Sequence, residues 1–527
     1  MKECAERSFL AMPAETQQRY WERFGLWYEQ HRQYLHALAA YRKSGNYDAL
    51  LRVIRSDAGI LLASLKPEDV LTALDNCPAE TLKAYPFAIL VLMRRMFTWQ
   101  QIPKMMELKA LLEAAVAQHP ERPAAERGNL LGECDLIQSF LFYNDITQMS
   151  RLHRSASCQM SRPAVTLRNS GSWTFGSPSV LMMYYRAPGE LGKELAEMYE
   201  CMPHYYKITN GHGRGAELLM DAEAAYLQGA WEKAAVLLER ARADAAGQEN
   251  MTLCCDFLAL RLTLCGKGKE GYDFAAKRAA LLQKHDGVQV HLLESIAAYF
   301  YALQGRPEQA PELFREHKLA EVSFFGPCRP MMSLIEQQVW LAQGEYVKVI
   351  AHSEGLLGRC EAMHYGLVGL QARIQLAAAQ LRFGQRADAR AALAAALLDA
   401  LQDDFWVLFV EQYPALAPLL EEEDWAVCEP RLGPFVARIL PAGRAFAARL
   451  GLPAPAPELP LTDRDRELAR LVAGRCTNKE IAAALYLSEG TVKQYINQLY
   501  AKLDMGGDPR TRRARLAEWY QKNAPRN

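Results

Sequence analysis

The chain has 527 residues and carries 61 basic and 61 acidic side chains, so its formal net charge at pH 7 is +0. A hydrophobic content of 50% and a charged content of 23% are those of an ordinary soluble protein. A chain of 527 residues is long enough for several domains or one long solenoid. No apolar run reaches the length that crosses a bilayer, so the sequence argues against a membrane protein and membrane partners.

Residues with reactive side chains are scattered along the chain. The 12 cysteines include one adjacent pair, Cys254 and Cys255, and no CxxC spacing, which is typical of reduced core thiols rather than a disulfide frame. Because no basic-then-apolar leader follows Met1, a cytoplasmic location is expected. The sequence contains no HExxH, no GxSxG and no paired acidic motif, so we expect no enzyme, no cofactor and no metal site.

Residues 1–90 have a helical pattern and are predicted to form a helical linking region. The stretch 20–28 is amphipathic and rich in aromatic residues, and it leads into apolar stretches at 36–41 and 47–51. This succession is typical of helix pairs. Helical patterns continue through 91–450, where we predict a superhelix of repeats.

A segment at 155–180 interrupts the helical pattern. It is rich in Ser, Gly and Pro and contains Trp173 and Phe175, and Tyr205 follows in a second aromatic-rich stretch. Long irregular loops inside a solenoid are often functional, and amphipathic aromatic side chains suit a ligand pocket. Trp173, Phe175 and Tyr205 are therefore candidate ligand-binding residues. The alternative is that the loop plugs the superhelix and its aromatic side chains pack as core.

A series of glycines organises residues 216–400, where the repeats are clearest. Successive members are 37, 39, 39 and 40 positions apart. This spacing fits two antiparallel helices with their connections, because glycine permits the turn between them and a small residue five positions later allows close helix packing. The series consists of Gly229, Gly266, Gly305, Gly344 and Gly384.

The series resembles the tetratricopeptide repeat (TPR), with a longer period. The resemblance implies units that stack into a superhelix, whose concave surface binds a peptide, a protein or a small molecule. The alternative is that the superhelix is only a spacer. The predicted fold class is all-α, with a TPR-like α-solenoid superhelix over 91–450.

Residues 451–460 are predicted to form a Pro-rich linker. Prolines alternate there with other residues, mostly alanine, and such a stretch cannot continue a helix and favours an extended spacer. The linker would allow the last domain, 461–527, to change position relative to the superhelix.

Three short helical patterns lie close together after the linker. Two of them open with a capping signature, Thr477-x-x-Glu480 and Ser488-x-x-Thr491, which satisfies the first free N–H groups of a helix. Only a tight turn separates these two helices. That is the layout of a helix-turn-helix, in which the second helix enters the major groove of DNA.

The second of these helices has one apolar face, formed by Val492, Ile496, Leu499 and Leu503. Lys493, Gln494 and Asn497 therefore point away from that face, toward solvent or DNA. Long side chains with several hydrogen-bond donors are those that read base edges and phosphates.

The charge distribution favours the same interpretation. Residues 459–527 hold 13 basic and 8 acidic side chains, a net charge of +5, and the rest of the chain is correspondingly acidic. A basic segment in a neutral protein attracts phosphate. The alternative is a small helical domain for protein contact, in which the exposed Lys and Gln side chains are simply solvated.

The tail resembles the LuxR-type DNA-binding domain in several motifs that keep their order and spacing. These are LTDRDRE at 461–467, NKEIA at 478–482, SEGTVK at 488–493 and KL at 502–503. The resemblance implies a four-helix domain in which Lys493, Gln494 and Asn497 face bases while Ser488, Thr491 and Lys502 lie near phosphates. The predicted DNA-binding residues are Lys479, Ser488, Thr491, Lys493, Gln494, Asn497, Lys502 and Arg512. The tail departs from the family at Tyr495, where His is usual, and in a lengthened turn at 504–509.

Together, the helical start, the repeats and the tail resemble the MalT-like large regulators of the LuxR superfamily. In those proteins a nucleotide-binding module precedes the linking region. This chain has no GxxxxGK[ST] motif, so ATP binding is not expected of it.

The sequence thus predicts a DNA-binding transcriptional regulator whose superhelix senses a small-molecule or protein effector and controls the C-terminal helix-turn-helix. The expected partners are double-stranded DNA, a second copy of the chain on DNA, and RNA polymerase. The competing interpretation is a protein-interaction scaffold with a vestigial or docking C-terminal domain.

Overall fold

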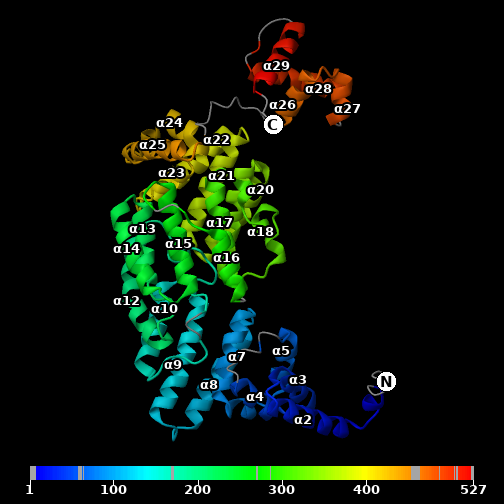
Figure 1. Ribbon diagram of the computed structural model, residues 1–527, viewed down its shortest axis with the longest axis vertical. Helices are drawn as coiled ribbons and strands as arrows, with labels where there is room; N and C mark the ends of the chain where they lie inside the picture. Colours follow the sequence, from blue (N-terminus) through cyan, green and yellow to red (C-terminus); the bar gives the residue numbers. More distant parts are fainter. Residues whose placement is uncertain are drawn as a thin grey trace.

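The structure is a computed structural model of the whole chain. It describes the residues 7–56, 62, 65–167, 171–268, 271–284, 286–452, 463–485, 487–503, 505 and 509–523. Throughout these ranges the chain forms α-helices joined by turns and short 3₁₀ segments, with no strand (Figure 1). The all-α fold class is therefore confirmed. No described helix is long and apolar enough to cross a membrane.

Within the described ranges, buried apolar side chains form three hydrophobic clusters. The first draws on residues 37–137, the second on 136–447 and the third on 468–516. The first two meet in helix α9 (Ala124–Ser139). Residue 90, the predicted end of the linking region, falls inside α7 (Pro86–Thr98).

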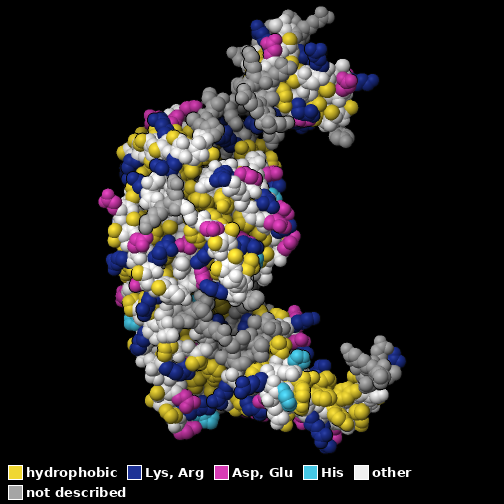
Figure 2. Space-filling model, in the orientation of Figure 1, with side chains coloured by type: hydrophobic (Ala, Val, Ile, Leu, Met, Phe, Trp, Pro, Cys, Tyr) yellow, Lys and Arg dark blue, Asp and Glu magenta, His cyan; other side chains and the backbone are white. Residues whose placement is uncertain are grey.

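The N-terminal cluster is built from helix pairs, as predicted for this region. Helix α7 lies at its centre, because an unbroken run from Ala88 to Met93 is buried on every side. Helix α2 instead leaves Phe24, Leu26 and Trp27 exposed, and apolar side chains gather over it in Figure 2. The remaining helices are α2 (Ala14–Gln30), α3 (Tyr34–Ser44), α4 (Tyr47–Ser56), α5 (Pro67–Asn76), α6 (Ala79–Lys83) and α8 (Ile102–Gln118).

The predicted irregular insertion is present but shorter than expected. Helix α10 (Ile146–Gln159) continues through the first five residues of the segment 155–180. The described irregular backbone begins at Met160 and ends where Ser179 caps the short helix α11 (Val180–Tyr184). The long helix α12 (Leu191–Thr209) then leads into the repeats.

The glycine series lies at the turns of helical hairpins, as the spacing predicted. All five glycines have a left-handed φ, between 68° and 88°, which glycine adopts without steric strain. The hairpins stack side by side as a solenoid (Figure 1). Their helices are α13 (Ala216–Leu227), α14 (Trp231–Asp244), α15 (Glu249–Leu264), α16 (Phe274–Gln283), α17 (Gly287–Leu303), α18 (Glu312–Arg315), α19 (Arg329–Gln343), α20 (Tyr346–Met363), α21 (Gly366–Arg382) and α22 (Arg386–Leu401).

One hairpin departs from the pattern. After Gly305 the second helix is reduced to α18, a single turn preceded by a 3₁₀ segment. Pro307 and Pro311 favour the break, because proline has no N–H to donate and its ring disrupts the hydrogen bonding of the preceding helical turn. Phe314 of α18 is nevertheless fully buried, so the shortened unit still fills its place in the core.

One turn glycine is also required by packing. A Cβ atom at Gly229 would lie 2.1 Å from Trp406, whereas a Cβ atom at Gly247 would meet nothing within 4 Å, although both residues have a positive φ. We expect Gly247→Ala to destabilise by about 1–2 kcal/mol, from backbone strain alone. Gly229→Ala should lose more, because it also displaces Trp406. Denaturant midpoints of the two variants test this, and equal losses would contradict the packing role.

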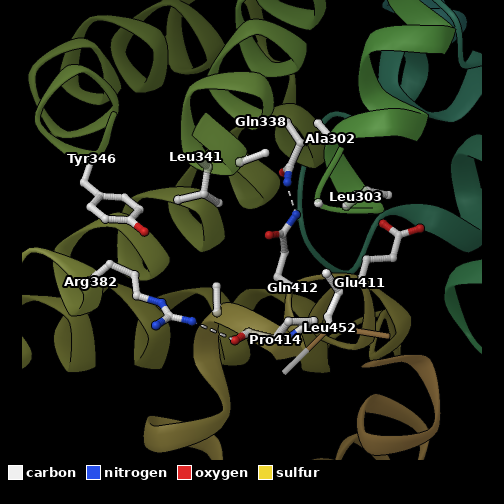
Figure 3. A pocket seen from close by; sticks show the side chains of 13 residues that line it. Ala302, Leu303, Gln338, Leu341, Tyr346, Arg382, Glu411, Gln412, Pro414 and Leu452 are labelled. Carbon is white, nitrogen blue, oxygen red and sulfur yellow. Dashed lines mark hydrogen bonds between the residues drawn. The ribbon is translucent and has the colours of Figure 1, made fainter. Parts of the chain in front are cut away.

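The stack ends in three short segments and one long helix before the linker: α23 (Val407–Glu411), α24 (Tyr413–Glu422), a 3₁₀ turn (Trp425–Val427) and the long α25 (Leu432–Arg449). A pocket of about 180 Å³ lies here, and Figure 3 shows Gln412 pointing across it to Gln338. Leu452 also lines the pocket. The rest of the predicted linker, 453–460, lies outside the described residues.

Candidate DNA-binding site

Four helices form the C-terminal domain: α26 (Asp463–Ala473), α27 (Asn478–Leu485), α28 (Glu489–Lys502) and α29 (Pro509–Asn523). They enclose a hydrophobic cluster of their own, to which each helix contributes, with Leu468, Ile481, Val492 and Leu516 at its centre. The predicted four-helix arrangement is therefore confirmed.

A reciprocal capping box begins α27, as predicted. The backbone N–H of Thr477 donates to Glu480 Oε2 at 2.6 Å, and the backbone N–H of Glu480 donates back to Thr477 Oγ1 at 3.3 Å. The hydrogen bond from the Thr477 N–H lowers the pKa of the Glu480 carboxyl, because it stabilises the charged form. The bonds described for Glu480 thus lie within its own helix start.

The second cap fixes the start of α28. The backbone N–H of Thr491 donates to Ser488 Oγ at 3.1 Å, and the two hydroxyls lie 2.7 Å apart. The turn before it is tight, because the Leu487 N–H already bonds to the Ala482 carbonyl at 2.9 Å. Two capped helices joined by so short a turn have the geometry of a helix-turn-helix.

The faces of α28 are oriented as the spacing predicted. Val492, Ile496 and Leu499 are buried, and Leu503 is partly buried against the same cluster. Consequently the opposite face carries three polar side chains, all exposed: Lys493, Gln494 and Asn497. These three lie within about one turn of one another, so the structure brings them together on one surface.

The other predicted contact residues lie at the starts of α27 and α28, at the end of α28 and on α29. Lys479 is exposed in the first turn of α27, whereas Ser488 and Thr491 are engaged in the cap of α28. Lys502 ends α28, but its side chain lies outside the described residues. Arg512 is half-buried, with its guanidinium 5.2 Å from the Tyr500 ring centre, so it contributes to packing between α28 and α29.

Two contacts that sequence reasoning missed hold the helices together. The Arg464 guanidinium of α26 lies 4.7 Å from the ring centre of Tyr495 on α28. Arg513 of α29 donates to Asn478 Oδ1 at 3.0 Å and to the Cys476 carbonyl, at the start of α27. Tyr495, which stands where His is usual, is the sequence feature that could have indicated the contact with Arg464. The second joins residues 35 or more positions apart and leaves no local pattern.

Residues 459–511 match the family described as bacterial regulatory proteins, luxR family. The C-terminal domain is of the LuxR type. Over 75 residues the chain is 41% identical to the Bacillus subtilis protein named "Uncharacterized transcriptional regulatory protein YvfU", covering 14% of this chain and 36% of that protein. Over 65 residues it is 42% identical to the Mycobacterium tuberculosis "DNA-binding transcriptional activator DevR/DosR", covering 12% of this chain and 29% of that protein.

These similarities end with the LuxR-type domain. The chain spans about a third of the length of the relatives it matches, and no solved structure matches it. The helical region before residue 459 is therefore interpreted from its own residues.

The predicted ligand-binding residues lie together in that region. Trp173, Phe175 and Tyr205 all line one cavity of about 430 Å³. Trp173 and Tyr205 are only 7% and 3% exposed, so they also belong to the hydrophobic core. The same aromatic side chains thus line the cavity and pack against the hydrophobic core.

The capping box offers a test of the LuxR-type domain's local stability. We expect Glu480→Ala to remove one reciprocal bond and to destabilise α27 by about 1 kcal/mol. Hydrogen exchange of the α27 amides in the full chain should then be roughly five times faster. The matched control is Glu518→Ala, which removes an exposed carboxylate from α29. Equal exchange in the two variants would exclude a capping role.

Proposed function

We propose that the protein is a DNA-binding transcriptional regulator of the LuxR type. The observation that carries this proposal is the exposed surface of α28, where Lys493, Gln494 and Asn497 project from the second helix of a capped helix-turn-helix. Lys493 supplies charge for a phosphate or a guanine edge, and the two amide side chains can pair with adenine. Lys479 and Lys502 are proposed to contact the phosphates on either side.

The helical region is proposed to sense an effector and to control this domain. The repeats, the shared cavity of Trp173, Phe175 and Tyr205, and the resemblance to MalT-like regulators support this step. An effector acts only if it binds one arrangement of the helices more tightly than another. The expected partners remain double-stranded DNA, a second copy of the chain and RNA polymerase, and the expected location is the cytoplasm.

A pair of domains on adjacent half-sites would raise affinity and specificity, because one small domain makes few base contacts. The last helix, α29, pairs such domains in the family that the tail resembles. Leu516 of α29 is fully buried in its own domain, and Trp519 and Tyr520 pack partly against the same cluster. Any pairing through α29 would therefore use the parts of Trp519 and Tyr520 that remain accessible.

Selection of duplex DNA from a random pool tests the proposal, with the full chain and residues 455–527 run in parallel. Enrichment of the same motif by both identifies the LuxR-type domain as the reader. Enrichment by the fragment alone indicates that the helical region inhibits it. If neither enriches a motif, DNA reading is rejected.

The second candidate function is a protein-interaction scaffold, favoured by the exposed apolar side chains of α2 and by the stacked repeats. Salt dependence separates the two functions. A domain that contacts phosphates loses DNA affinity steeply as salt rises, because binding releases counterions. A docking module would show no such DNA binding.

A further inference from the structure

Arg475 lies in the turn between α26 and α27, and its backbone has a left-handed φ of 61°. The Cys476 N–H donates to the Leu471 carbonyl at 3.1 Å. The Arg475 N–H donates to the Val472 carbonyl at 3.0 Å. These two bonds form a Schellman motif, in which the left-handed residue after the helix end is usually glycine. Gly474 stands one position earlier, so an arginine occupies the glycine position here.

The backbone on both sides of Arg475 is held in place. Arg513 of α29 donates to the Cys476 carbonyl, and the Thr477 N–H donates to Glu480 in the capping box that begins α27. The turn is therefore fixed by hydrogen bonds to α26, α27 and α29. The Arg475 side chain is nevertheless exposed, so a well-supported turn presents a guanidinium group at the surface.

Arg475 also differs from most cations of the LuxR-type domain in having no partner. The Lys and Arg side chains of this domain that interact within the chain are Arg464, Arg466, Arg470, Arg512, Arg513 and Arg515. The other cations with a described side chain are Arg475, Lys479 and Lys493, all exposed and without a hydrogen bond, ion pair or ring contact to the described residues. Lys479 and Lys493 are predicted DNA contacts, and Arg475 shares their availability.

The place of Arg475 in the domain suits a phosphate contact. In a helix-turn-helix the second helix enters the major groove while the first helix crosses the DNA backbone. Arg475 lies just before α27, the first of these helices, whose first turn carries Lys479. A guanidinium group is planar, stays charged at every relevant pH and can donate two parallel hydrogen bonds to one phosphate.

We propose that Arg475 is a further DNA-contact residue, which binds a backbone phosphate near the phosphates assigned to Lys479. Such a contact positions the domain on the duplex and carries no sequence information, because every nucleotide presents the same phosphate. Arg475 lies between the LuxR-type motifs at 461–467 and 478–482, so the resemblance does not assign it a role. The inference rests on the proposed DNA-binding function and adds a residue to it.

Arg475→Gly tests this contact in the full chain. Glycine adopts the left-handed turn without strain, so hydrogen exchange of the α26 amides should be no faster than in the parent chain. Affinity for the selected motif and for a scrambled duplex should nevertheless fall equally, by about 3- to 10-fold. The slope of log affinity against log salt concentration should decrease by about one. Arg475→Lys keeps the charge and should retain that slope.

The N-terminal region offers a closely matched control, Arg32→Gly. Arg32 follows α2 in the same motif, because its N–H donates to the Glu29 carbonyl at 3.0 Å and the Gln33 N–H donates to the Tyr28 carbonyl at 2.8 Å. Arg32 has a φ of 57° and is exposed. Its replacement makes the same chemical change outside the LuxR-type domain and should leave DNA affinity and salt dependence unchanged. Equal DNA affinities of Arg475→Gly and Arg32→Gly would overturn the proposal.

The remaining outcomes separate this contact from the proposed function. If the parent chain binds no DNA, both are rejected. If the parent chain binds the motif and Arg475→Gly binds it equally well, only the Arg475 contact is rejected. A loss confined to the motif would identify a base contact in place of a phosphate contact and would overturn the proposal. Weaker binding together with faster exchange of α26 would overturn it in favour of a structural role.

Discussion

Lys493→Ala is expected to weaken DNA binding by about 10- to 100-fold and to flatten the sequence preference, corresponding to roughly 1–3 kcal/mol for one base-reading side chain. The side chain is exposed on the face of α28 opposite the buried Val492 and Ile496. Its removal should therefore leave the helix folded while deleting a positive charge and a donor from the proposed groove surface. Titration of the motif selected by the full chain, against a scrambled duplex, measures both effects.

The matched control for this variant is Lys348→Ala, which removes the same charge from α20 of the repeats. It should bind the motif as the parent chain does. The dependence of affinity on salt concentration adds a second readout. If Lys493 contacts only phosphate, its removal should lower affinity equally for the motif and the scrambled duplex and reduce the salt slope by about one. If Lys493 reads a base, its removal should lower affinity mainly for the motif. Binding by Lys493→Ala that equals the control would reject α28 as the recognition helix.

The LuxR-type domain was the most predictable part of the fold, because its signals are local. The capping partners Thr477 and Glu480 are three residues apart, and the buried face of α28 repeats every three or four residues. In a helix, residues three or four positions apart lie on the same face, and a capping pair three positions apart is within hydrogen-bonding distance. The structure confirms these predictions of geometry, and the DNA contacts stay a proposal.

In the repeats, the positions of the turns could be predicted from the sequence, but the lengths of the helices could not. Glycine at a left-handed turn is a local requirement, so all five turns were predicted correctly. The short α18 was not, although Pro307 and Pro311 are visible in the sequence. The period of the series favoured a full second helix there, and the missing N–H groups of the two prolines opposed it.

The cavity lined by Trp173 and the buried ion pair between Arg261 and Glu411 were beyond prediction, because both depend on distant residues. The cavity joins Arg94 to Phe325, and the ion pair joins residues 150 positions apart. Contacts at this range follow from how the hairpins stack, for which a single sequence offers no spacing rule. The aromatic-rich composition of the insertion and of the stretch after it indicated three lining residues, Trp173, Phe175 and Tyr205, and none of the polar ones.

Glu411→Ala is expected to be the most destabilising of these substitutions, by about 3–5 kcal/mol. Glu411 of α23 lies in the core of the repeat stack and accepts two bonds from the buried Arg261 guanidinium, at 2.8 and 3.0 Å. The hydroxyls of Tyr226 and Tyr299 also donate to it, at 2.7 and 3.3 Å. Removal of the carboxylate would leave the buried Arg261 cation without its ion-pair partner, while the hydroxyls of Tyr226 and Tyr299 would keep only their contacts with the Arg261 carbonyl, Cys265 and Gln371.

An exposed pair provides the control: Asp404→Ala breaks the ion pair with Arg438 at the surface, where such pairs contribute about 0–1 kcal/mol. Denaturant midpoints of the two variants should therefore differ clearly, and similar midpoints would exclude a structural role for the buried network. Hydrogen exchange should also show faster opening of α23 and α25 in Glu411→Ala, because α23 packs on α25 and the network ties α23 to α13, α15 and α17. Since α25 ends the stack just before the linker, loosening it would alter how the LuxR-type domain is attached to the repeats.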